Sequence, residues 1–214
     1  TLEPSSAASD VYKRQALMQG LADGYFVLPY TIGDYLADDI RTGPIATDGP
    51  EFDAAEESVR SQINTFIDNK GSKTVDYFHR KLGKIIWDKC GMSRNEKQLK
   101  EAIKEVKALR EQFYKDVYVP GTANSFNEPL AKALRVADFL ELGELFAKDA
   151  LERSESCGGH FREESQTPEG EALRDDANYT FVSAWEYKGE PSQAKLHKEA
   201  LDYENIELKT RSYK

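Results

Sequence analysis

The chain has 214 residues, of which 39% are hydrophobic and 31% are charged, a composition ordinary for a globular domain. Its formal net charge of −9 argues against non-specific nucleic-acid binding, because phosphate contacts need clustered Lys and Arg. No window approaches the roughly 18 to 20 consecutive apolar residues that a membrane-spanning helix needs. The two cysteines, Cys90 and Cys157, form no CxxC pair, so neither a disulfide framework nor a zinc or iron–sulfur site is supported.

The first fifty residues divide into three segments. Residues 1–15 carry Ser and Ala with little periodicity, and we interpret them as a disordered or foreign N-terminal segment. Residues 16–40 mix small and large apolar residues at helical spacing around Pro29, which predicts a helix, a break at Phe26–Tyr30 and a second short helix. Residues 41–50 are rich in Pro, Gly and polar residues, and we expect a linker there.

Residues 51–153 show four helical patterns, in which apolar residues recur every three or four positions and line one face each. The four stripes are Phe52, Ala55, Val59, Ile63, Phe66 and Ile67; Val75, Phe78, Leu82, Ile85 and Ile86; Leu99, Ile103, Val106, Leu109 and Phe113; and Leu130, Leu134, Ala137, Phe139, Leu142 and Phe146. Ser93 followed by Glu96 has the form of a capping box and would start the third helix. The short connections favour antiparallel neighbours, so we predict a mainly α fold with an antiparallel bundle of three to four helices.

The segment from residue 154 to residue 214 is predicted to form a small α+β domain with short strands. Aromatic and small or polar residues alternate from Tyr179 to Tyr187, which is the periodicity of a strand. The loop before this strand gathers polar side chains between glycines and clusters of acids: Ser154, Ser156, Cys157, His160, Arg162 and Arg174. In its simplest interpretation this loop is a charged connector, whose Gly158 and Gly159 end the preceding helix.

Several side chains allow a structural or a functional interpretation. His160 and Arg162 are predicted to form a structural hydrogen-bonded corner without proton transfer. The four acids of the loop suggest a metal site but are more typical of a solvated segment: Glu163, Glu164, Glu169 and Glu171. His79 is predicted to be a surface or boundary residue rather than a ligand. Trp87 and Cys90 are expected in the core or at an interface, because nothing nearby would form the thiolate.

These segments resemble the flavoprotein subunits of succinate dehydrogenases and fumarate reductases. The run from Ser156 to Arg162 and the triplet Arg174, Asp175, Asp176 resemble the Ser-Arg-Gly-Ala-His-x-Arg and Arg-Asp-Asp segments of that family's C-terminal domain. Cys157 stands where most of the family has Arg, and Gly159 stands where it has Ala. The resemblance extends over residues 16–214, through ALMQGLADGYFVLPYTIGDYLADD, RKLGKIIWDKCGMSRN, LAKALRVADFLELGELF and the closing ENIELKTRSYK.

The resemblance implies a C-terminal fragment of a subunit that interconverts succinate and fumarate by hydride transfer through FAD. Electrons would pass to an iron–sulfur subunit and, through it, to a membrane-anchor cytochrome subunit, on the cytoplasmic side of a bacterial cell membrane. Residues 16–40 would be the C-terminal end of the FAD-binding domain. In the family a helix N-terminus points backbone N–H groups at the flavin; by position Ala16 and Leu17 would supply them here, with Gln15 standing where the family has Asn.

The residues that carry the family's chemistry have no match in this chain. Its Gly-rich dinucleotide fingerprint, flavin-attaching His, proton-donating Arg and substrate-binding His and Thr would all lie upstream of Ala16. We therefore expect no catalytic residue and no metal ligand here, and a fragment that by itself neither binds FAD stably nor turns over substrate. The His160 and Arg162 corner would hold the C-terminal domain against the flavin domain. Two alternatives stay open: an L-aspartate oxidase-like flavoenzyme, and a non-catalytic helical interaction module.

Overall fold

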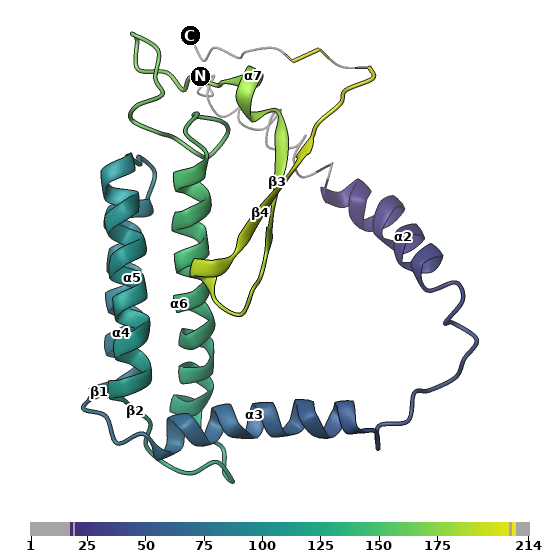
Figure 1. The fold of residues 1–214 in the computed structure, drawn as a ribbon, viewed down its shortest axis with the longest axis vertical. Helices are drawn as coiled ribbons and strands as arrows, with labels where there is room; N and C mark the ends of the chain where they lie inside the picture. Colours follow the sequence, from purple (N-terminus) through teal and green to yellow (C-terminus); the bar gives the residue numbers. More distant parts are fainter. Residues whose placement is uncertain (1–17, 19, 206, 209–214) are drawn as a thin grey trace, which may run out of the picture. The chain divides into compact units, whose positions relative to one another are not determined.

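The structure is a computed structural model that describes residues 18, 20–205 and 207–208. The chain divides into two compact units, one up to Ala55 and one from Glu56 onward. Figure 1 shows the order of helices and strands along the chain. The second unit contains three long helices, α4 to α6, and a two-stranded hairpin, β3 and β4.

The first unit is helical around Pro29. A π-helical turn, η1 (Asp23–Val27), continues directly into α2 (Leu28–Tyr35). The predicted break at Phe26–Tyr30 is therefore wrong, because Pro29 lies in the first turn of α2, where its missing N–H costs little, and the wider π-turn precedes it. None of the residues of η1 and α2 is buried within this unit. A helix with so many exposed apolar side chains requires a further partner to cover them.

Helix α3 (Pro50–Asp68) contributes to the core only near its C-terminal end. Phe66 is fully buried, and Ile63 and Ile67 pack partly against the core. Phe52 and Val59 are 44% and 55% exposed, so the predicted packing stripe is wrong for the first half of this helix. The bundle is thus made of three helices, which is within the predicted range of three to four.

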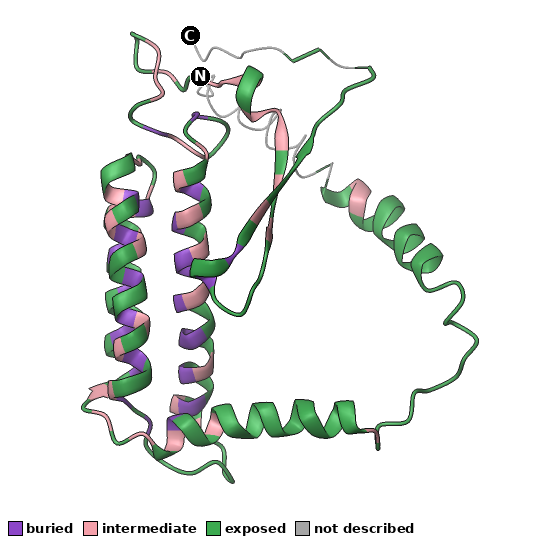
Figure 2. Ribbon diagram, viewed as in Figure 1, coloured by how far each residue is buried: buried purple, intermediate pink, exposed green. Residues whose placement is uncertain are grey.

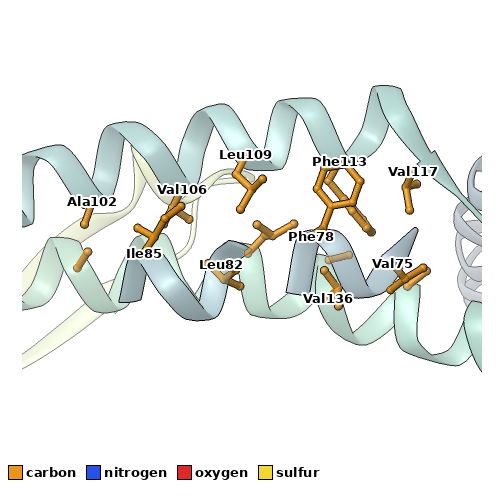
Figure 3. Close-up of a cluster of buried hydrophobic side chains, with 14 of the residues drawn as sticks. Val75, Phe78, Leu82, Ile85, Ala102, Val106, Leu109, Phe113, Val117 and Val136 are labelled. Carbon is orange, nitrogen blue, oxygen red and sulfur yellow. The ribbon is translucent and has the colours of Figure 1, made fainter. Parts of the chain in front are cut away.

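Helices α4 (Val75–Cys90), α5 (Glu96–Asp116) and α6 (Glu128–Glu152) form that bundle. Their buried residues form stripes that face one another (Figure 2), and Figure 3 shows the aromatic and aliphatic side chains that interdigitate between the helices. The rings of Phe78 and Phe113 meet edge to face with their centroids 5.2 Å apart. The predicted stripes of α4 and α5 are confirmed, since all of their members are buried or partly buried in this core.

The predicted stripe of α6 is only partly correct. Phe139, Leu142 and Phe146 are 43%, 60% and 45% exposed, whereas the neighbouring Leu140 and Ala147 are fully buried. Apolar residues surround α6 on more than one side, so periodicity alone does not identify its core face. Packing makes the choice: a Cβ at the buried Gly143 would lie 3.3 Å from Leu82 and 3.8 Å from Val106, against α4 and α5.

One end of the bundle is closed by a short parallel strand pairing. Strands β1 (Lys73–Thr74) and β2 (Val117–Tyr118) pair in parallel, just before α4 and just after α5. Gly71 is required there, because a Cβ would lie 2.1 Å from backbone atoms of Asp116. The side-chain amide of Asn127 caps the start of α6 by accepting from the N–H of Leu130 at 2.9 Å.

The C-terminal part contains the predicted small sheet. After the short helix α7 (Asp176–Tyr179), strand β3 (Phe181–Glu186) pairs antiparallel with β4 (Lys195–Ala200), and the 3-10 turn η2 (Pro191–Gln193) lies between them. The predicted strand is confirmed, although it begins at Phe181 because Tyr179 ends α7. Lys148 of α6 holds this hairpin through the carbonyls of Pro191 and Ala194, at 3.2 and 3.0 Å.

Candidate functional site

The loop after α6 folds back onto the bundle and forms a buried polar corner. The corner consists of one residue from the α4–α5 connection and four from the loop: Arg94, Arg153, Ser156, His160 and Arg162. The guanidinium of Arg162 is buried and donates to the carbonyl oxygens of Ala150, Leu151 and Arg153, at 3.1, 3.3 and 3.2 Å. The last carbonyls of a helix have no partner within the helix itself. Arg162 therefore caps the C-terminus of α6.

A tight turn within the loop places Arg162. The hydroxyl of Ser156 accepts from the N–H of Arg162 at 2.8 Å and donates to its carbonyl at 3.2 Å. Between them, Cys157 and His160 exchange two backbone hydrogen bonds around Gly158, whose φ of 59° lies in the left-handed region. The prediction that the glycines end the preceding helix is wrong: α6 ends at Glu152, and Gly158 serves this hairpin turn instead.

His160 is held at both ring nitrogens. The guanidinium of Arg94 donates to Nδ1 at 2.8 Å, so Nε2 carries the proton and donates to the carbonyl of Arg153 at 2.7 Å. Burial lowers the pKa of His160, and the nearby charges of Arg94, Arg162 and Arg153 lower it further, although the hydrogen bond to the Arg153 carbonyl acts in the opposite direction. With a fixed neutral tautomer and both nitrogens occupied, His160 has no nitrogen available for proton transfer. These contacts agree with the predicted structural corner.

Two acids of the loop bind the start of α5. Glu163 accepts from the Ser93 hydroxyl at 2.8 Å and from the Asn95 amide at 2.9 Å. Glu164 accepts from the N–H of Glu96 at 2.6 Å. Burial opposes the charge of Glu164, but the Glu96 N–H and the Arg162 guanidinium outweigh it and lower the pKa of this carboxyl.

The true N-cap of α5 is Asn95, whose Oδ1 accepts from the N–H of Gln98 at 2.9 Å. The predicted capping box of Ser93 and Glu96 is therefore wrong. The physical reason is tertiary: Glu164 accepts from the Glu96 N–H that the Ser93 hydroxyl would have satisfied, and that hydroxyl donates to Glu163 instead. A cap of this kind leaves no signal in the sequence around Ser93.

Neither cysteine is activated. Cys157 is exposed as a residue, and the partial desolvation of its thiol together with the charge of Glu155 raises the pKa of that thiol, although Arg174 and Arg153 act in the opposite direction. Cys90 is 2% exposed, as predicted for a core residue, and burial raises its thiol pKa as well. Both side chains remain protonated at neutral pH, and a protonated thiol is a poor nucleophile.

Arg153 and Arg94 complete the corner, and sequence reasoning did not single out either of them. Arg153 donates to the carbonyls of Tyr179 and Phe181, both at 3.0 Å, and its guanidinium lies 4.9 Å from the ring of Phe181. It also pairs with the buried Glu155 at 2.6 Å. The sequence did contain one indication of the role of Arg153, the aromatic run at the start of the strand, because an arginine can stack on such rings.

A cavity of about 280 Å³ beside the corner is lined by Ser154, Glu155, Ser165, Leu173, Arg174 and Asp175. Glu155 is committed to Arg153 and to the N–H of Asp175, and Arg174 pairs with Asp176 at 2.5 Å. Across the described ranges, no three His, Cys, Asp or Glu side chains are close enough to hold a metal ion. The corner can cap, orient and stabilise, and its described residues contain no nucleophile paired with a base.

The predicted flavin contacts, Ala16 and Leu17, lie outside the described residues and stay predictions. His79 is exposed, as predicted, and its ring lies 5.8 Å from that of Phe139. Trp87 is 82% exposed, so the prediction of a core position is wrong and that of an interface remains.

The fold and the corner define a helical bundle with an appended hairpin, joined by a buried polar corner. The chain matches the family described as "Fumarate reductase flavoprotein C-term" over residues 79–213. It therefore belongs to the family of fumarate reductase flavoprotein C-terminal domains.

Curated relatives agree with this family. The chain is 28% identical to the fumarate reductase flavoprotein subunit of Proteus vulgaris, over 60% of this chain and 21% of that protein. It is 28% identical to the Escherichia coli subunit, over 67% of this chain and 24% of that protein. An uncharacterized FAD-dependent oxidoreductase of Methanocaldococcus jannaschii is 30% identical over 51% of this chain and 19% of its own length. The chain thus spans about a fifth to a quarter of the length of these relatives.

Solved structures show the same fold. A quinol-fumarate reductase with menaquinol molecules matches 82% of this chain and 29% of its own with a TM-score of 0.66 at 20% identity. An adenylylsulfate reductase of Archaeoglobus fulgidus matches 74% of this chain and 26% of its own with a TM-score of 0.57 at 16% identity. Proteins with differently named activities share this architecture, so the fold by itself does not select a substrate.

Proposed function

We propose that this chain is the C-terminal part of the flavoprotein subunit of a succinate dehydrogenase or fumarate reductase. The observation that carries the proposal is the family match over residues 79–213 in a domain whose described residues hold no catalytic set. The named relatives are several times longer than this chain. The chemistry therefore belongs to the remainder of the longer protein, and this part supplies structure.

The proposed domain organisation follows from that assignment. Residues 16–40 are the end of an FAD-binding domain, 41–50 a linker, 51–153 the helical domain and 154–214 the small C-terminal domain. The exposed apolar side chains of α2 support this division, because such a helix belongs in the core of a larger domain. The predominantly buried stripes of α4 and α5 support an independent core for the helical domain.

The described residues do not fit an FAD site by themselves. A dinucleotide needs a cradle of available backbone N–H groups or cations for its pyrophosphate. The buried Arg162 donates to the carbonyls at the end of α6 and to Glu164, and Arg153 donates to Glu155 and to the carbonyls of Tyr179 and Phe181. In the complete subunit FAD would supply hydride transfer between succinate and fumarate. The corner of this chain contributes by fixing the C-terminal domain on the bundle.

The proposed partners are an iron–sulfur subunit and, through it, a membrane-anchor cytochrome subunit, with the assembly on the cytoplasmic side of the cell membrane. Among the helices that the structure describes, none is both long and apolar enough to cross a bilayer.

The test uses the coding sequence upstream of Ala16 and its complete product. We expect a Gly-rich nucleotide-binding half upstream, a yellow purified protein with flavin absorbance bands, and fumarate reduction by reduced benzyl viologen. The 214-residue chain, purified in parallel, is expected to be colourless and inactive. A complete product without a flavin, or one that oxidises L-aspartate and leaves fumarate unreduced, would contradict the proposal. The first result would favour an interaction module and the second an L-aspartate oxidase-like enzyme.

A further inference from the structure

The bundle has an apolar face that remains exposed in the described chain. On α6, Arg135, Phe139, Leu142 and Phe146 follow one another at intervals of four, three and four residues, so they form one stripe. Phe139, Leu142 and Phe146 are between 43% and 60% exposed. Scattered surface apolar residues are normal, but a continuous stripe of this size marks an interaction site.

Helix α4 supplies the other half of this surface. The ring of His79 lies 5.8 Å from that of Phe139, and Arg94 lies 5.0 Å from the ring of Phe146. Gly83 and Trp87 follow His79 at intervals of four residues, which places them on the same side of α4. Two arginines at the rim complete the surface, which we call the α4–α6 face: His79, Gly83, Trp87, Phe139, Leu142 and Phe146, with Arg80 and Arg135.

Gly83 is an independent sign that another backbone approaches this face. A Cβ at this position would meet no atom within 4 Å, so packing inside the described chain does not require a glycine. Glycine inside a helix is less stable than alanine. A close contact from outside would account for it, since small residues let two backbones approach.

The charges at the rim indicate the chemistry of the partner. Two neighbouring lysines are paired, Lys84 with Asp88 at 2.7 Å and Lys132 with Glu128 at 3.3 Å, and the ammonium of Lys81 lies 5.7 Å from the ring of Tyr77. Arg80 and Arg135 have no carboxylate within ion-pair distance among the residues the structure describes. In a chain of net charge −9, two such arginines beside Trp and Phe match the composition of interface cores.

We propose that the α4–α6 face binds an amphipathic helix of another polypeptide segment, one with apolar residues at helical spacing and Asp or Glu along its edges. Laid between α4 and α6, this helix becomes the fourth member of the bundle and covers the exposed Phe139, Leu142 and Phe146. Gly83 lets its backbone come close, and its acids pair with Arg80 and Arg135. The inference does not depend on the proposed enzymatic function, because it rests on the bundle alone.

The probe is a synthetic helical peptide with Leu at positions i, i+3, i+4 and i+7 and Glu on both flanks. A scrambled peptide of the same composition is the control. Binding to the 214-residue chain is measured by titration calorimetry and by tryptophan fluorescence, in which the exposed indole of Trp87 should contribute a shift to shorter wavelength when it is covered. We expect saturable binding of the helical peptide to a monomeric chain and no binding of the scrambled one.

Three variants test the geometry. Leu142→Glu should weaken binding by more than about tenfold, whereas Phe126→Glu, at a residue 96% exposed in the α5–α6 connection, should leave it unchanged. Gly83→Ala should raise the melting temperature of the chain and yet weaken peptide binding, two effects of opposite direction. Arg80→Glu combined with Arg135→Glu should weaken binding of the Glu-flanked peptide and strengthen binding of a Lys-flanked one.

Contrary outcomes are equally specific. Equal binding of the scrambled peptide, or unchanged affinity in Leu142→Glu, would overturn the proposal. So would an unchanged affinity in Gly83→Ala. Sedimentation equilibrium showing a dimer that Leu142→Glu dissociates would overturn it in favour of a second copy of this chain as the occupant.

Discussion

The core between α4, α5 and α6 and the corner around Arg162 are both buried, but different forces stabilise them. In the core, Phe78 and Phe113 contribute apolar area and close packing, and each contact is one of many (Figure 3). In the corner, Arg162 and His160 satisfy specific carbonyls and a specific guanidinium. Loss of a core side chain therefore costs in proportion to the volume removed, and loss of a corner side chain costs according to the polar groups left without partners.

Truncation in the core should have the largest effect. Phe113 is fully buried, and its ring lies 5.4 Å from Phe66 and 5.2 Å from Phe78. Phe113→Ala should lower the free energy of unfolding by about 3–5 kcal/mol, because it opens a cavity between three elements. The free energy of unfolding is measured by urea denaturation, monitored by circular dichroism. Phe126→Ala, at an exposed phenylalanine, should stay within about 0.5 kcal/mol, and equal losses in both variants would contradict this description of the core.

Removal of the guanidinium from the corner should rank second. Arg162→Met leaves the carbonyls of Ala150, Leu151 and Arg153 without this donor, at a cost of about 2–3 kcal/mol. Arg162→Lys should retain only part of this stability, because an ammonium lacks the planar, forked donors of a guanidinium. Hydrogen exchange should show faster exchange at the Ser156 and Arg162 amides. Arg135→Met is the control on an exposed face; full recovery by Lys would show that charge alone matters.

The corner should also make stability depend on pH, which the apolar core cannot do. The pKa of His160 is lowered in the folded chain, so the unfolded chain takes up a proton first as the pH falls. This contribution is fully present above the unfolded pKa of about 6.5 and is lost as the pH falls through the lower folded pKa. His160→Gln keeps a donor and an acceptor but cannot titrate.

The measurement is the free energy of unfolding of both proteins between about pH 8 and pH 5, a window that spans the unfolded histidine pKa. The wild-type chain should lose stability relative to His160→Gln over the acid half of that window. His197→Gln, which removes an exposed histidine paired with Glu186, is the control. Parallel curves for wild type and His160→Gln would mean that His160 does not titrate differently in the folded chain.

The smallest effect distinguishes the two caps of α5. Asn95→Ala should cost about 1 kcal/mol, since it removes the acceptor for the Gln98 N–H. Ser93→Ala removes one exposed hydrogen bond to Glu163 and should stay within about 0.5 kcal/mol. Thermal unfolding of both variants gives the comparison. The reverse order would restore the capping box of Ser93 and Glu96.

Sequence periodicity predicted the bundle well where a helix has one apolar face. The stripes of α4 and α5 are of this kind, and Val75, Phe78, Val106 and Phe113 are buried as predicted. On α6 periodicity wrongly placed Phe139, Leu142 and Phe146 in the core. This helix has apolar residues on two sides, and its neighbours decide which side is covered. The apolar residues on the side of α6 that its neighbours do not cover belong to the α4–α6 face.

The corner was predicted in part. His160 and Arg162 stood out because a histidine and an arginine lay in a glycine-containing loop, and in the structure both donate to the carbonyl of Arg153. Arg94 and Arg153 did not stand out, since one lies 66 residues before His160 and the other follows a helix end without any pattern of its own. Ala16 and Leu17 remain predictions outside the described residues.

The sequence by itself determined the family, the helical class and the small C-terminal sheet, because each depends on local pattern or composition. Only the tertiary structure decided which side of α6 is buried, that Asn95 with two distant acids begins α5, and that a neutral His160 lies between Arg94 and a carbonyl. These features depend on groups far apart in the chain, and their hydrogen bonds and packing exist only after the helices have met.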